Sequence, residues 1–403
     1  MTRWLVLITF AAILIITPIT THAQSEITLV DSSAGVYFPS GLAFNMEAAS
    51  DNDIVKVRLH YEVDRMTYAP VTNEAWPVFT PSPKVKAQWV WDMRKVRLPL
   101  PPGAAVTYWW TIEDAAGDTL TTPSQIIRFD DIRYTWQKVT SGQISLFWYK
   151  GTQSFADELM AAGQQALDML AEDTGVSLKQ PVSIYIYASA EDLRGAMVYP
   201  QEWTGGIAEY QYGLIAIGIP TNDLSWGKGT LAHELGHMVT HQITFSPYGA
   251  VLPFWLDEGL ATYAQGELDP YLERVLQNAI AQNKLISVRS LASPFSAIPE
   301  QAYLSYAESQ SVVAFLIQNY GGDKMLQLLN LFKIGSTYDE ALIQIYGFDQ
   351  DGLDSLWQEY IYGQTQSRSE LQYDSLCGNS IDRFSWDNML GTMIKTGTLL
   401  GAD

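Results

Sequence analysis

Alternating apolar and polar positions dominate the first part of the chain, from about residue 27 to residue 131. The apolar members of the two clearest segments are Val55, Val57, Leu59, Tyr61 and Val63, and then Val106, Tyr108, Trp110 and Ile112. A period of two residues predicts strands with one buried face. Proline and glycine divide the rest of the region into short pieces. The pattern predicts an all-β sandwich of the immunoglobulin or fibronectin type at residues 24–131.

The pattern changes after residue 132. Apolar runs predict strands at 144–148, 181–187 and 213–219, and helical spacing predicts a helix over 155–172 that stops at Gly175. Beyond residue 266 the chain is predicted to be mainly helical, with helices at 271–282, 302–319, 324–332, 339–346 and 353–362. We therefore expect a multidomain protein whose second domain, residues 132–364, is α+β with a largely helical C-terminal half. Residues 365–403 lose the periodicity and are predicted to form a flexible tail.

The first 23 residues have the pattern of a signal peptide. Arg3 precedes an apolar run over residues 4–16, and the small-residue segment ends at Ala23. The run is too short to cross a bilayer comfortably. We expect export, cleavage after Ala23, an extracellular or cell-envelope location and no stable membrane span in the mature chain. An uncleaved anchor is the alternative. Residues 389–400 are also too short and too interrupted by glycine to span a membrane.

Composition narrows the possible partners. The formal net charge is −20, and loss of Arg3 with the signal makes it −20 − 1 = −21. Such an acidic surface repels phosphate backbones, so a nucleic acid partner is not expected. Cys377 is the single cysteine, which excludes a disulfide within one chain despite the expected export. The oligomeric state stays open.

The strongest chemical motif is His-Glu-Leu-Gly-His at residues 233–237. On a helix, His233 and His237 leave the same face one turn apart. In this H-E-x-x-H arrangement the two imidazoles bind a zinc ion, and Glu234 lies beside it as the candidate general base. Catalytic zinc usually takes three protein ligands and a water. Glu258 can return to the metal from a second helix. His241 is interpreted as a residue outside the ligand set, either simply polar or supporting a ligand from behind.

Together with the later motif Trp-Leu-Asp-Glu-Gly-Leu-Ala at residues 255–261, this stretch resembles the gluzincin metallopeptidases, and most of all the bacterial peptidase MA-like domains. The resemblance covers roughly residues 136–363. It implies a zincin-type fold, one Zn²⁺ ion held by His233, His237 and Glu258, and a peptide or protein substrate.

The resemblance also implies a substrate-binding edge strand just before the zinc helix. Its residues here are Gly205, Gly206, Ile207 and Ala208. An exposed strand edge binds an extended peptide through backbone hydrogen bonds. Gluzincin aminopeptidases have a Gly-x-Met-Glu-Asn motif at this place, whose Glu grips the substrate amino terminus. Ala208 stands where that Glu would be, and Glu209 is one place off and so on the other face, which argues against aminopeptidase activity.

Tyr306 resembles the gluzincin tyrosine whose hydroxyl faces the tetrahedral intermediate. In that role it donates a hydrogen bond to the developing oxyanion. A tyrosine packed in the core is the alternative, and Tyr303 is the second candidate on the same helix face. Thr262 lies one turn from Glu258, where it can orient that carboxylate or occupy the helix surface.

The function predicted from these residues is that of an exported zinc metallopeptidase hydrolysing peptide bonds with Glu234 as the base. The alternative is a non-catalytic cell-surface binding protein with a structural or idle metal site. Glu234 argues against it, because a structural site needs no base. Hydrolysis of a non-peptide ester or amide is a third possibility.

In the first domain, His60 is interpreted as a solvated side chain. The aromatic pairs are interpreted as core packing or as a carbohydrate platform; they are Trp89 with Trp91 and Trp109 with Trp110.

Overall fold

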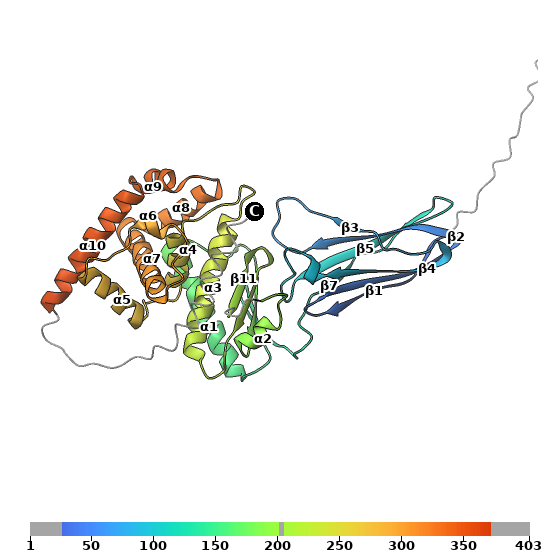
Figure 1. Ribbon diagram of the computed structural model, residues 1–403, viewed down its shortest axis with the longest axis horizontal. Helices are drawn as coiled ribbons and strands as arrows, with labels where there is room; N and C mark the ends of the chain where they lie inside the picture. The colour runs from blue at the N-terminus through green and yellow to red at the C-terminus, as the bar shows by residue number, and fades with distance from the viewer. Residues whose placement is uncertain (1–25, 201–204, 372–403) are drawn as a thin grey trace, which may run out of the picture.

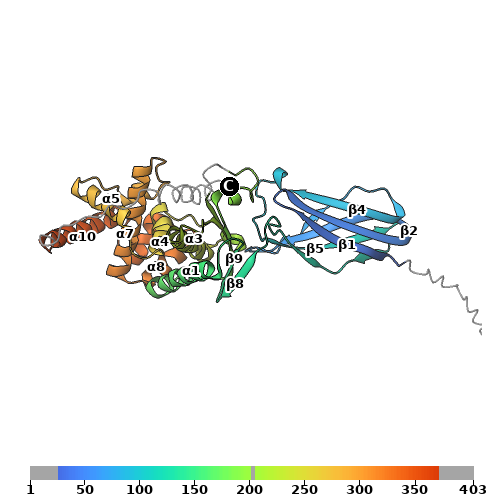
Figure 2. The same ribbon diagram turned by 90° about the horizontal axis from the view of Figure 1, so that it is seen from below.

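The computed structural model describes residues 26–200 and 205–371, with side chains to residue 363. It contains an elongated β domain followed by a domain in which helices cover a smaller sheet (Figures 1 and 2). The predicted signal peptide, Cys377 and residues 389–400 lie outside the described residues. None of the helices in the described ranges combines the length and the hydropathy that a membrane crossing needs.

The first domain consists of antiparallel strands arranged around one long strand, β2. The first half of β2 pairs with β1 and β4, and its second half pairs with β5 and β3. The predicted β-rich first domain is therefore confirmed, while its immunoglobulin-like topology stays a prediction. The strands are β1 Thr28–Tyr37, β2 Gly41–Val63, β3 Asn73–Ala75, β4 Ser82–Asp92, β5 Ala105–Asp114, β6 Thr119–Thr121 and β7 Gln125–Arg128.

Side-chain alternation follows the prediction in β5 and departs from it once in β2. Along β5, Val106 and every second residue after it are buried. In β2 the prediction is wrong at Val55, which is exposed, while Ile54 is buried. The pairing of β2 with β5 shifts register between Ile54 and Lys56. An extra residue at such a bulge moves the side chains that precede it to the opposite face, and local periodicity does not reveal the shift.

Trp89, Trp91 and Trp109 of the first domain pack against neighbouring aromatic rings. Trp89 stacks on Phe44 and on Tyr61, with ring centroids 5.8 and 5.3 Å apart. Trp110 is fully buried. These contacts favour core packing over a carbohydrate platform, because a sugar-binding platform needs ring faces open to solvent.

His60 is not the solvated side chain that the strand pattern suggested. Its Nε2 lies 2.9 Å from Thr111 Oγ1, and its ring stacks on Trp109 of the adjacent strand at 5.3 Å. The prediction was wrong because cross-strand neighbours, which the local sequence does not show, cover the imidazole.

The second domain contains a five-stranded mixed sheet in the order β11-β12-β10-β9-β8. Strands β9, β10 and β12 are parallel, and β8 and β11 are antiparallel strands at the two edges. The strands predicted at 144–148, 181–187 and 213–219 are confirmed. Their bounds are β8 Gln137–Ser141, β9 Ile144–Trp148, β10 Val182–Tyr187, β11 Gly206–Glu209 and β12 Leu214–Gly218.

Both faces of this sheet are buried, which explains the continuous apolar runs of its central strands. Ile184 belongs to the core shared with the helices, whereas Tyr185 belongs to the core shared with the first domain. The Tyr187 hydroxyl donates to Asp131 Oδ2 at 3.0 Å, and Arg133 Nη2 donates to the same oxygen at 2.6 Å. The connection between the two domains is therefore packed against the sheet.

Helices form most of the second domain and confirm its predicted helical C-terminal half. The first of them stops at Gly175, which has a left-handed φ of 70°, as predicted. The last helix continues past the predicted boundary at Gln364. The bounds are α1 Gln153–Thr174, α2 Ala190–Arg194, α3 Leu224–Thr244, α4 Phe254–Tyr263, α5 Pro270–Ala281, α6 Val288–Leu291, α7 Pro299–Tyr320, α8 Asp323–Lys333, α9 Tyr338–Tyr346 and α10 Gln350–Leu371.

Candidate metal centre

The site forms where helices α3 and α4 approach each other closely. A Cβ atom added to Gly236 on α3 would lie 2.7 Å from the Cα of Ala261 on α4. A Cβ on Gly259 would lie 2.5 Å from the Ser309 carbonyl oxygen of α7. The glycine in each motif therefore permits a helix contact that any larger residue would push apart. This packing brings Glu258 of α4 to the histidines of α3.

The three predicted ligands lie together as a compact triangle. His233 Nε2 and His237 Nε2 are 3.1 Å apart, and each lies 3.4 Å from Glu258 Oε2. A tetrahedral ion with bonds of about 2.0–2.1 Å separates its ligand atoms by about 3.3–3.4 Å. All three side chains are buried. The spacing and the donor set, two imidazole nitrogens and one carboxylate oxygen, both fit a zinc ion.

Glu234 lies beside this triangle with an unpaired carboxylate. The residue is fully buried, and neither of its side-chain oxygens has a hydrogen-bond partner among the described residues. Glu258 Oε2 likewise has no hydrogen bond of good geometry to any described residue. Buried carboxylates are strongly destabilising unless they are paired or bind a cation or water. Buried carboxylate oxygens without hydrogen-bond partners are suited to bind a cation and a water molecule.

Burial and neighbouring charges set the protonation of these groups. Burial raises the pKa of Glu234 to about 7. Burial also opposes charge on His237, but the carboxylates of Asp257 and Glu258 outweigh it and raise the pKa of that imidazole. For Asp257, the histidines His241 and His237 overcome burial and lower the carboxyl pKa. The pocket therefore holds an excess of buried carboxylates, which favours a cation.

The second ring nitrogen, Nδ1, of each of these histidines also contacts a polar side chain. His237 Nδ1 lies 3.0 Å from Asp257 Oδ1, and His233 Nδ1 lies 3.0 Å from the Gln265 side-chain amide. A metal at Nε2 leaves the proton on Nδ1, and at His237 the Asp257 carboxylate accepts it. At His233 the neighbouring atom is the Gln265 amide nitrogen Nε2, and a half-turn of that amide group puts its oxygen there as the acceptor. The sequence analysis missed both residues. Asp257 could have been noticed as the second carboxylate of the later motif, but nothing in the sequence marks Gln265.

Tyr306 lies close to the triangle and Tyr303 has a different environment. The Tyr306 ring is buried, 6.4 Å from the His233 ring and 5.2 Å from that of Phe295. Burial, and then the charges of Glu258 and Glu234, raise its pKa, so the hydroxyl keeps its proton and can donate it to a hydrogen bond. Tyr303 instead packs edge-on against Tyr271 of α5 at 5.2 Å.

Thr262 fits neither of its two interpretations. It is buried, not on the helix surface, and its hydroxyl has no hydrogen-bond partner among the residues described. The surface interpretation was wrong because α4 is packed against both α3 and α7, long-range contacts that a helical period does not reveal.

Strand β11 lies beside α3 at the edge of the sheet (Figure 1). Gly206, Ile207 and Ala208 pair with β12, and Gly205 accepts a hydrogen bond from the Gly218 amide at 2.9 Å. Among the described strands β12 is its sole partner, so its second edge is unpaired. Ala208 packs into the helical core, whereas Ile207 packs on the first-domain side, and strand geometry puts Glu209 on the side of Ile207. Glu209 thus points away from α3, as predicted.

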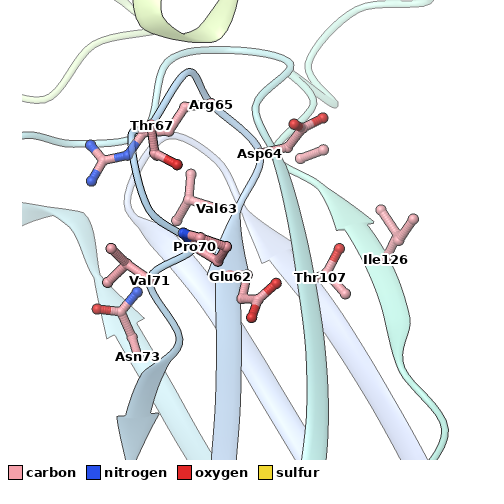
Figure 3. A pocket seen from close by; sticks show the side chains of 11 residues that line it. Glu62, Val63, Asp64, Arg65, Thr67, Pro70, Val71, Asn73, Thr107 and Ile126 are labelled. Atoms are coloured by element: carbon pink, nitrogen blue, oxygen red, sulfur yellow. The ribbon is translucent and has the colours of Figure 1, made fainter. Parts of the chain in front are cut away.

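A cavity of about 300 Å³ opens at one end of the first domain (Figure 3). It lies among the ends of β2, β5 and β7 and the loop that follows β2. Its lining includes Glu62, Arg65 and Val71 but none of the residues of the metal site. This cavity is therefore separate from the metal site.

A family model for the peptidase MA superfamily matches residues 162–363, which include both motifs and the helices that carry them. The chain belongs to the peptidase MA superfamily. Membership supports a peptidase, a hydrolase of peptide bonds. A comparison with curated proteins found no match.

Three solved structures show distant similarity. An M1 zinc metallopeptidase from Deinococcus radiodurans is 13% identical over 79% of this chain and 89% of that chain, with a TM-score of 0.32. An aminopeptidase N family protein from Idiomarina loihiensis is 10% identical over 83% and 72%, with a TM-score of 0.29. OgpA from Akkermansia muciniphila is 9% identical over 26% of this chain and 28% of that chain, with a TM-score of 0.21. This chain thus spans little more than a quarter of OgpA, and the superfamily assignment rests on the family match.

Proposed function

We propose that this chain is an exported zinc-dependent peptidase with its active site at His233, Glu234, His237 and Glu258. The observation that carries the proposal is the triangle of two Nε2 atoms and one Oε2 atom, with edges of 3.1 to 3.4 Å. Beside it lies the buried Glu234 carboxylate, which has no hydrogen-bond partner within the part of the chain that the structure describes. Three protein ligands and a free fourth position are typical of catalytic zinc, whereas structural zinc is closed by four protein ligands.

The chain's own residues supply proton transfer and orientation. Zinc, when bound, acts as a Lewis acid that polarises the scissile carbonyl and acidifies a water molecule. Glu234 takes a proton from the attacking water and passes it to the leaving amine. The Tyr306 hydroxyl donates a hydrogen bond to the oxyanion that develops at the carbonyl. Asp257 and Gln265 keep the imidazoles of His237 and His233 in the required tautomer.

We propose an extended peptide as the substrate, bound along the unpaired edge of β11. Backbone hydrogen bonds from a strand edge hold a peptide largely independently of its side chains. Ala208 on the α3 side offers no carboxylate for a substrate amino terminus, and Glu209 points to the other side. The arrangement favours cleavage within a chain over removal of the first residue.

The alternative readings are a binding protein with an idle metal site and a hydrolase of esters or non-peptide amides. The unpaired Glu234 carboxylate argues against the first, because burying it serves no structural purpose. The second uses the same groups, so comparing esters and amides of one acyl group with peptides separates it from peptide hydrolysis.

Removal of the metal tests the proposal directly. We expect the purified protein to cleave members of a peptide library. The cleavage rate should fall more than about a hundredfold when a chelator removes the metal, because the transition state loses several kcal/mol of charge stabilisation. About one equivalent of zinc should restore cleavage. Metal content by mass spectrometry is measured alongside. Cleavage that persists in protein shown to be metal-free would contradict the proposal.

Export is part of the proposal and rests on the charged, apolar and small-residue pattern of residues 1–23. We expect the exported protein to begin at Gln24. Its intact mass tests this, and a product that still carries residues 4–16 would show an uncleaved anchor.

A further inference from the structure

A third histidine follows the two ligands on the same face of α3. His241 comes four residues after His237, and the two rings are 6.1 Å apart. His241 Nε2 lies 3.1 Å from Asp257 Oδ2, while the other oxygen of that carboxylate, Oδ1, lies 3.0 Å from His237 Nδ1. Because an ionised carboxylate only accepts, both histidines donate to it. The Asp257 carboxylate is thus hydrogen-bonded through one oxygen to the proposed metal ligand His237 and through the other to His241.

The other side of His241 contacts the segment that carries the substrate strand. Its ring stacks on Tyr210 with centroids 5.0 Å apart and an interplanar angle of 27°. Tyr210 begins the short 3₁₀ helix Tyr210–Tyr212, which directly follows β11. Stacking fixes the plane of the imidazole, and the plane decides where its N–H points. One side chain therefore links the turn after β11 to the carboxylate that holds His237.

We propose that His241 is a positioning residue that orients the Asp257 carboxylate and, through it, the His237 imidazole at the metal. The inference rests on the proposed zinc function. Without the His241 donor, the carboxylate can rotate away from Nδ1, and His237 loses the partner that sets its tautomer and ring plane. Removing a group that holds a metal ligand in this way typically weakens metal binding by about 10- to 100-fold.

A second ion is the competing explanation for the same cluster, because His237, His241 and Asp257 also place three ligand atoms close together. The two nitrogen–oxygen distances, 3.0 and 3.1 Å, are those of ordinary hydrogen bonds. An ion there would take His237 Nδ1 while the first takes Nε2, so that one imidazole would bridge two metals. Metal stoichiometry distinguishes the two explanations.

The test compares substitutions at His241 in the full chain. His241→Leu removes the hydrogen-bond donor. His241→Gln places an amide nitrogen near the position of Nε2. His241→Asn carries the same amide on a side chain one bond shorter, so its nitrogen does not reach that position. We expect the zinc dissociation constant, measured against a competing chelator, to rise about 10- to 100-fold for Leu and Asn and to return close to the parent value for Gln. His60→Leu in the first domain is the control and should leave the affinity unchanged.

A spectroscopic readout accompanies the affinities. The visible spectrum of the cobalt-substituted protein reports the geometry of the ligands and should change for Leu and Asn but not for Gln. If the Leu variant does not fold, the Gln and Asn pair decides, since both carry the same amide. Parent-like affinity and spectrum in the Asn variant would overturn the inference, as would two zinc ions in the parent protein and one in the variant. Zinc binding without any peptide cleavage would overturn the proposed function and still leave the role of His241 measurable.

Discussion

Glu234→Gln is expected to lower kcat for peptide cleavage by about two to four orders of magnitude while zinc stays bound. The side chain is fully buried beside the ligand triangle, and both carboxylate oxygens lack partners among the described residues. Glutamine has the same shape and keeps the packing, but its amide cannot take a proton from water. The loss should therefore fall on kcat, with little change in KM, because the substrate is held elsewhere.

Zinc content and peptide binding are the controls for this variant. Both should equal those of the parent protein, since Glu234 is not among the three ligands. Cleavage at the parent rate by a zinc-loaded Gln variant would remove Glu234 from the mechanism. A parent protein that binds zinc and peptides but cleaves none would instead favour the binding-protein reading.

Glu258→Gln is expected to weaken zinc binding by more than about a hundredfold, because loss of a direct ligand exceeds the 10- to 100-fold typical of its supporting residues. Oε2 of Glu258 lies 3.4 Å from both imidazole nitrogens, and its charge offsets part of that of the metal. An amide oxygen is a poorer, uncharged ligand. Activity at limiting zinc should fall in parallel, and competition with a chelator measures the affinity.

Glu308→Gln provides a matched control for this loss. Glu308 is as deeply buried as Glu258, and both of its oxygens accept from the Ile286 amide at 3.1 Å instead of facing the metal. Burial raises its pKa to about 8, so it is mostly protonated at neutral pH and glutamine resembles it closely. The control should bind zinc as the parent protein does. Equal losses in both variants would indicate general destabilisation and contradict a ligand role for Glu258.

Local sequence patterns predicted the features that depend only on residues close together in the chain. The spacing of His233 and His237 determines that both imidazoles share a helix face, whatever surrounds the helix. Continuous apolar runs likewise predicted the central strands, because such a run has to be covered on both faces of the sheet. Residues that stop helices marked the C-terminal helices. Length and flanking glycines then set most element bounds to within a few residues.

Contacts between distant segments decided the rest. The sequence offered Glu258 as a third ligand, but only the packing of Gly236 against Ala261 brings α4 close enough to α3 for its carboxylate to complete the triangle. Two further residues contact the second ring nitrogens of the histidines: Asp257 of α4 and Gln265 just beyond that helix. The later motif offered Asp257 as a carboxylate, but nothing in the sequence marks Gln265. The same limit explains the errors at Val55 and His60, where strand register and cross-strand neighbours determine burial.

Thus the sequence alone determined which residues can do the chemistry and which secondary structure carries them, because backbone period and side-chain type act over a few residues. The tertiary structure decided which of these residues meet, that β11 lies at an unpaired sheet edge beside the metal helix, and that His241 faces Asp257. These depend on helix and strand packing summed over the whole domain, which no short stretch of sequence encodes by itself.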